Sequence, residues 1–131
     1  MTEQIRPSPP EKDIPVQYIL MIYGNEAAMQ SASKADIDTM HAAYGAYTEA
    51  LKKAGVMVGG DRLHPSSSAA TVRVKDGKSS VLNGPYAETR EQLGGYYIVD
   101  VPDLDVAIAW AARCPGASSG AMEVRPIWMM S

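Results

Sequence analysis

The sequence predicts an α+β fold of the ferredoxin-like type, a four-stranded antiparallel sheet with two helices on one face and an inserted β-hairpin. Two observations lead to it: the patterns run β-α-β, hairpin, β-α-β along the chain, and two strand-length runs are apolar on both sides. A length of 131 residues fits one domain with one core. We therefore expect a single domain over residues 16–131, after a disordered, proline-rich tail over residues 1–15.

The first half contains a strand and the most regular helix pattern. Residues 16–23 form a strand-length apolar run. Ser33 is a suitable N-cap for a helix that Gly55 ends, and apolar side chains recur between them at steps of three and four. These positions are Ile37, Met40, Tyr44, Tyr47, Leu51 and Ala54. The strand that follows contains Gly59-Gly60, which predicts a bulge or a close backbone approach.

A β-hairpin is predicted over residues 71–82. Its Asp76-Gly77 pair suits a type I′ turn, and its polar side chains indicate a hairpin that faces solvent. Such an insertion either wraps a partner or extends the sheet. Residues 87–92, rich in charged side chains, are predicted to form one or two helical turns.

The second half repeats the strand and helix order. Residues 93–101 form the second strand that is apolar on both faces. Asp103 caps a helix that ends at Cys114-Pro115-Gly116, and a loop of small residues follows. Residues 122–128 alternate between polar and apolar, and their proline indicates a strand at the edge of the sheet.

The strands that are apolar on both sides also predict an assembly. Helices cover one face of the sheet, so the apolar side chains of the other face need a second cover. In a chain of 131 residues the available cover is a second copy. We therefore expect a homodimer whose two sheets face each other.

Composition excludes several classes of function. The net charge is −3 without a basic block, which argues against direct contact with nucleic acid. One cysteine cannot form an intramolecular disulfide, and the Cys and His spacing predicts neither a metal site nor a cofactor. The chain shows no signal peptide, and its longest apolar run is too short to span a bilayer. The expectation is a soluble, cytoplasmic protein without membrane contact.

Asp61, Arg62 and His64 place an acid, a base and an imidazole at one strand end. Such a group can bind a polar or acidic small molecule or transfer protons. The alternative is a solvated strand end with a local ion pair.

Four further side chains need an interpretation. Tyr44 either lines a pocket or belongs to the core, whereas Tyr47 is expected to be a core residue with a satisfied hydroxyl. His41 lies beside the apolar stripe and is interpreted as a surface residue. Cys114 follows a helix C-terminus, where a thiol is not activated as a nucleophile.

Several segments together resemble the YCII-related proteins of the DGPF branch. They are Leu20-Met21-Ile22-Tyr23, Ala54-Gly55, Gly59-Gly60, the 71–77 hairpin segment, Asn83-Gly84-Pro85-Tyr86-Ala87-Glu88-Thr89-Arg90-Glu91, Leu93-Gly94-Gly95-Tyr96-Tyr97, Asp103-Leu104-Asp105, Trp110 to Pro115 and Glu123-Val124-Arg125-Pro126. The resemblance implies a dimeric α+β barrel. The motif that names the branch reads Asn83-Gly84-Pro85-Tyr86 here, with Asn for Asp and Tyr for Phe.

The resemblance also bears on activity. The better-known YCII branch has a proposed His and Asp pair, whose slots fall on or near Tyr44 and on Cys114, so the pair is not retained. The resemblance leaves open a small-molecule-binding protein with a pocket between the first helix and the sheet, either a cofactor-free or a degenerate enzyme. It also leaves open a non-catalytic regulatory module, because family members often accompany extracytoplasmic-function sigma factors. The third reading is a structural dimer without a retained site.

Overall fold

A computed structural model describes residues 16–129 of the chain. The elements are β1 (Gln17–Gly24), α1 (Glu26–Gln30), α2 (Lys34–Lys53), β2 (Met57–Arg62), the 3-10 turn η1 (Ser66–Ser68), β3 (Ala70–Lys75), β4 (Lys78–Asn83), β5 (Gln92–Asp100), α3 (Leu104–Arg113), α4 (Gly116–Ser119) and β6 (Ala121–Pro126). The tail predicted for residues 1–15 lies outside the described residues.

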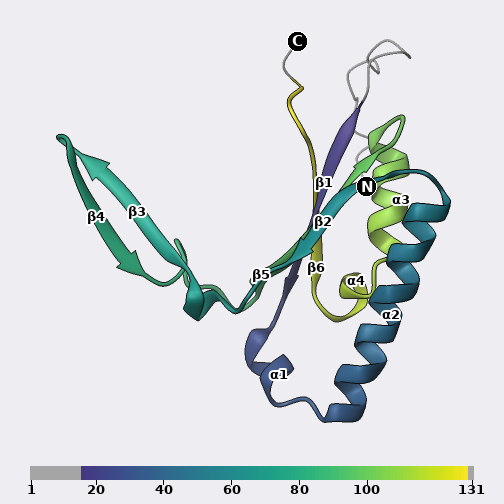
Figure 1. Ribbon diagram of the computed structural model, residues 1–131, viewed down its shortest axis with the longest axis horizontal. Helices are drawn as coiled ribbons and strands as arrows, with labels where there is room; N and C mark the ends of the chain where they lie inside the picture. The colour runs from purple at the N-terminus through teal and green to yellow at the C-terminus, as the bar shows by residue number, and fades with distance from the viewer. Residues whose placement is uncertain (1–15, 130–131) are drawn as a thin grey trace, which may run out of the picture.

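The main sheet has four strands in the order β2-β5-β1-β6, and each neighbouring pair is antiparallel. As predicted, the two strands that are apolar on both sides, β1 and β5, are central, and β6 is an edge strand. Helices α2 and α3 lie on the same side of this sheet (Figure 1). The prediction of an α+β fold with a four-stranded antiparallel sheet is therefore confirmed.

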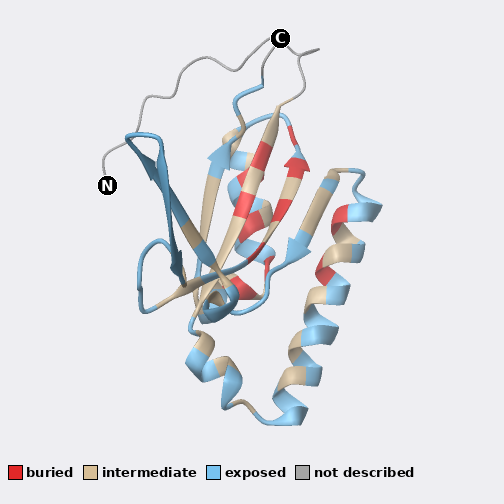
Figure 2. Ribbon diagram, turned by 60° about the vertical axis from the view of Figure 1, so that its left-hand side comes forward, coloured by how far each residue is buried: buried red, intermediate tan, exposed pale blue. Residues whose placement is uncertain are grey.

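The core lies between this sheet and the two long helices. Figure 2 shows the buried positions on the central strands and on the sheet-facing sides of the helices. Leu20, Leu51 and Val99 are the largest fully buried side chains. Tyr47 is a core residue, as predicted: its hydroxyl donates to the Trp110 carbonyl at 2.7 Å, so burial leaves no unpaired polar atom there.

Helix α2 forms where its caps and stripe predict. The Ser33 hydroxyl accepts from the Asp36 amide at 3.1 Å, and Gly55 takes a φ of 73° just beyond the C-terminus. The stripe divides along the helix: Tyr47 and Leu51 are buried in the core, Met40 and Tyr44 are half-buried, and Ala54 at the C-terminal end is exposed. The N-terminal half of α2 is thus free to border a cavity.

The glycine pair and the hairpin turn also have the predicted conformations. The register of β2 against β5 shifts between Met57 and Gly59, which is the bulge. A Cβ on Gly60 would lie 2.8 Å from the Tyr96 carbonyl oxygen, so the backbones approach closely as well. In the hairpin turn, Asp76 and Gly77 both have positive φ, 52° and 76°.

Two local predictions are wrong. Residues 87–91 form no helix, because the side chains of Thr89 and Gln92 bond to nearby backbone carbonyls and hold an irregular loop. The small-residue loop after Pro115 contains a short helix, α4, whose Gly116 is buried. Helix α1, five residues long, was not anticipated because so short a segment shows no periodicity.

The other face of the sheet is not covered by a helix. Ile19, Met21 and Ile98 face this side, and all three are half-buried. Ile19 lies directly opposite Ile98 in the β1-β5 pair, and Met21 is the next residue of β1 on the same face. The β3-β4 hairpin extends from the domain on this side, away from α2 and α3 (Figure 1). Among residues 16–129, no helix is both long enough and apolar enough to cross a membrane.

Candidate functional site

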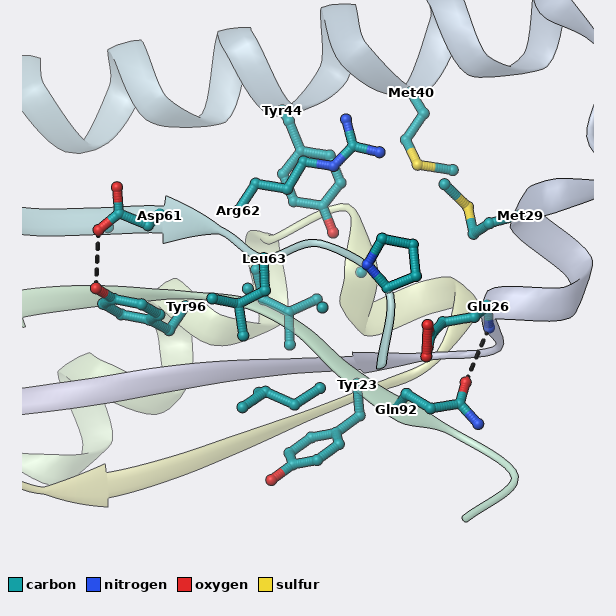
Figure 3. A pocket seen from close by; sticks show the side chains of 18 of the residues that line it. Tyr23, Glu26, Met29, Met40, Tyr44, Asp61, Arg62, Leu63, Gln92 and Tyr96 are labelled. Carbon is teal, nitrogen blue, oxygen red and sulfur yellow. Dashed lines mark hydrogen bonds between the residues drawn. The ribbon is translucent and has the colours of Figure 1, made fainter. Parts of the chain in front are cut away.

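A cavity of about 490 Å³ lies between the N-terminal half of α2, helix α1 and the adjoining ends of β1, β2 and β5 (Figure 3). Its wall is mainly apolar, and the apolar side chains come from helices, strands and the loop after β2. They include Ile22, Met29, Ile37, Met40, Met57, Leu63 and Leu93. Polar groups are fewer and lie at particular points of this wall, an arrangement typical of a small-molecule site.

Tyr44 and Cys114 meet at the inner end of the cavity, although 70 residues separate them. The Tyr44 hydroxyl and the Cys114 thiol are hydrogen-bonding neighbours, and the Gly116 amide lies beside both groups. A Cβ on Gly116 would lie 2.7 Å from the Tyr44 hydroxyl oxygen and 2.7 Å from a methyl of Ile22. Glycine at position 116 is what lets this hydroxyl approach the thiol.

Neither group of this pair ionises at neutral pH. Burial is the main cause that raises the pKa of the Tyr44 hydroxyl well above its usual range, and the neighbouring thiol raises it further. Burial likewise raises the pKa of the Cys114 thiol, against smaller opposing effects of the Gly116 amide and Tyr44. The pair therefore offers a hydrogen-bonding surface without a thiolate or a tyrosinate.

Cys114 should accordingly react slowly with thiol reagents. The residue is 2% exposed and its thiol pKa is raised, so both access and the thiolate fraction are small. With an aromatic disulfide reagent at neutral pH, we expect labelling at least about 100-fold slower in the folded chain than in denaturant. Equal rates in the two conditions would contradict this description of the pair.

Arg62 and His41 form the polar edge of the cavity. Nη1 of Arg62 lies 3.1 Å from Nε2 of His41. Because arginine has only donors, the imidazole nitrogen is the acceptor and carries no proton. His64 also lines the cavity and is exposed.

Asp61 also lines the cavity, but its carboxylate is bound by Tyr96. Consecutive strand residues point to opposite faces, and the Asp61 carboxylate instead accepts from the Tyr96 hydroxyl at 2.8 Å (Figure 3). The acid, base and imidazole that follow one another in the sequence are thus separated by the pleat. A local Asp61 to Arg62 ion pair is not formed, and the positive charge of Arg62 faces the cavity side.

The short helix α1 is held in place at its N-terminus, by a backbone amide and by its first side chain. The Glu26 amide donates to Oε1 of Gln92 at 3.0 Å, and the Glu26 carboxylate accepts from the Ser66 amide at 2.7 Å. Asn25 caps the helix by accepting from the Ala28 amide at 3.0 Å. These bonds tie α1 to β5 and η1 and so fix one wall of the cavity.

Of the residues chosen from sequence, Tyr44, Asp61, Arg62 and His64 line the cavity, and Cys114 contacts Tyr44. His41 is exposed, as interpreted, and it also lines the cavity beside Arg62. The signal for it was present, because His41 lies three residues before Tyr44 and four after Ile37, on the flank of the apolar stripe.

Fold and site together define a small α+β protein with a cavity of ligand size between its helix layer and one antiparallel sheet. The comparisons with known proteins are more specific. The model of the YCII-related domain matches residues 16–131. The uncharacterized protein R00369 of Rhizobium meliloti (strain 1021) is 35% identical over 112 residues, which cover 84% of this chain and 90% of that protein. The chain belongs to the YCII-related family.

Proposed function

We propose that the protein binds a small molecule with an apolar body and a polar end in the cavity beside Tyr44. The observation that carries this proposal is the cavity itself, since about 490 Å³ lies within the range that ligand pockets occupy. The methionine, isoleucine and leucine side chains of its wall suit the apolar body. The Arg62 guanidinium has free donors for the polar end, and the Tyr44 hydroxyl can accept from it.

Binding without turnover is favoured over catalysis. The slots of the family's proposed pair hold Tyr44 and Cys114, both of which keep their protons at neutral pH. A protonated tyrosine and a protonated thiol act neither as a general base nor as a nucleophile. We infer a binding protein derived from an enzyme-like pocket, which uses these groups to orient a ligand.

A tryptophan at position 40 tests this proposal. Met40 lines the cavity, so its replacement by Trp fills space that a ligand needs, whereas Ala43 is exposed on the same helix. With a fragment library of small organic acids, amides and alcohols screened by ligand-detected NMR, we expect Met40→Trp to weaken binding of the hits at least about tenfold. Ala43→Trp should bind like wild type, and unchanged binding by Met40→Trp would contradict the proposal.

A second part of the proposal concerns assembly. The strand order supports a ferredoxin-like arrangement, and the half-buried Ile19, Met21 and Ile98 support a homodimer in which a second copy covers them, giving a dimeric α+β barrel. The Asn83-Gly84-Pro85-Tyr86 segment resembles the motif of the DGPF branch and supports membership of it, and the φ of 123° at Gly84 explains the glycine of that motif.

The second candidate function is a regulatory role, and the protonated state of Tyr44 and Cys114 favours it as well. A sensor beside an extracytoplasmic-function sigma factor requires binding without turnover, which the protonated Tyr44 and Cys114 permit. Affinity purification from the native cell should then recover a transcription regulator. Recovery of the chain alone would contradict this role and leave the ligand site unaffected.

A further inference from the structure

The β3-β4 hairpin is built as an arm rather than as part of the domain. Every residue from 72 to 83 is exposed, and the two strands pair only with each other. An isolated two-stranded hairpin in water is marginal, even with a favourable turn such as Asp76-Gly77. A hairpin of this kind gains stability when one of its faces is covered.

The two faces of the arm differ in chemistry. Val72 lies directly opposite Val81. Val74, two residues nearer the turn, is the next residue of β3 on the same face. These three side chains are 59%, 62% and 68% exposed. The opposite face carries Arg73, Ser80 and the Lys75 to Lys78 pair, with Leu82 as its one exposed large apolar side chain, so it is the more polar face. The valine face is therefore the side that requires a partner.

The position and size of the free surfaces indicate a second copy as that partner. The arm leaves the domain on the side of the sheet that no helix covers (Figure 1). A four-stranded face with strands of up to nine residues covers only about 500 Å². A stable interface takes about 800 Å² of accessible surface from each partner, and the arm adds apolar area to what this small sheet face supplies.

We propose that residues 70–83 form an exchanged arm, which packs its Val72, Val74 and Val81 face against the flank of a second copy of this chain. The inference rests on the dimer proposed above and adds that the hairpin of each copy contacts the other copy. By two-fold symmetry each protomer contributes one arm to its partner, and the basic face of each arm stays in solvent.

The test compares two hairpin variants of the full chain by sedimentation equilibrium. Val72→Lys/Val81→Glu places a charged pair on the valine face, and Arg73→Lys/Ser80→Glu places the same pair, also directly opposite, on the solvent face. Both keep a favourable cross-strand contact. Burial of one valine side chain at an interface raises the association constant by more than about tenfold. We therefore expect the first variant to raise the dimer dissociation constant at least about tenfold. The second should stay within about twofold of wild type.

Hydrogen exchange of the wild-type chain gives a second readout. Amides of residues 70–83 should be protected at concentrations above the dissociation constant and should lose protection on dilution. A wild-type monomer at all concentrations would contradict the dimer and the arm together. A wild-type dimer that both variants form with equal affinity, or whose hairpin exchanges at the same rate before and after dilution, would contradict the arm alone.

Discussion

Raising the pH above about 10 should unfold this protein. Exposed tyrosines ionise in the same pH range, but their ionisation does not change the free energy of unfolding. Burial is the main cause that raises the pKa of Tyr47 and of Tyr97, and it also raises the pKa of Tyr44 and of Cys114. These groups keep their protons in the folded state. In the unfolded chain they release them near their ordinary pKa values, which are about 8.5 for cysteine and about 10 for tyrosine.

The sign of the effect follows from this difference. Below the unfolded pKa values both states are protonated, so these groups add no pH dependence. Above them the unfolded state binds fewer protons than the folded state, and the free energy of unfolding falls as the pH rises. Each group lowers it by up to about 1.4 kcal/mol per pH unit. Allowing for solvent screening, we expect Tyr44 and Tyr47 together to cost about 3 kcal/mol between about pH 10 and pH 12, and Tyr97 to act in the same direction.

Denaturant unfolding at a series of pH values, followed with tyrosinate absorbance, measures this effect. Tyr47→Phe should flatten the pH dependence, although it also removes the bond to the Trp110 carbonyl. Tyr86→Phe is the matched control, because Tyr86 is 75% exposed and should leave the slope unchanged. Tyrosine ionisation that is complete before any unfolding would contradict the described burial.

Gly120→Ala should be the most damaging single methyl addition at the α4-β6 junction. A Cβ at this position would overlap the Tyr23 carbonyl oxygen and lie 3.2 Å from the Gly24 backbone. Neither atom belongs to a flexible side chain, so β1 or the junction has to move. We expect a loss of about 3 kcal/mol, equivalent to a Tm about 10 °C lower.

Gly45→Ala is the matched control for this substitution. Gly45 lies within α2, and a Cβ there would meet no atom within 4 Å. Alanine should therefore raise stability by about 0.5 to 1 kcal/mol. Thermal unfolding of the two variants compares them directly, and equal melting temperatures would contradict the close packing of α4 against the end of β1.

The extent of sequence prediction differs between elements for physical reasons. Helix α2 was predictable because twenty residues show a continuous stripe with a cap at each end. Gly59-Gly60 was predictable because a glycine pair within a strand marks a bulge or a close backbone approach, and Asp76-Gly77 because a type I′ turn takes positive φ at both positions. The helix predicted over residues 87–92 is absent, because charged and polar residues are as common in a loop held by side-chain hydrogen bonds as in the first turn of a helix.

The site could be predicted only in part. Tyr44 and Arg62 were identifiable from the stripe and the strand end. The role of His41, and the wall formed by Glu26 and Gln92, depend on contacts between residues far apart in the chain. The separation of Asp61 from Arg62 follows from the pleat, once β2 is known to continue through both. The Tyr44 to Cys114 contact could be anticipated only from the family's paired slots.

The most direct test of the proposed ligand site is a crystal structure of the full chain soaked with the small organic acids and amides that bind in solution. The account predicts a molecule bounded by Met40, Leu63 and Tyr44, with its polar end within hydrogen-bond distance of Arg62 or of the Tyr44 hydroxyl. A cavity filled by its own side chains, or ligands bound only elsewhere on the protein, would contradict it.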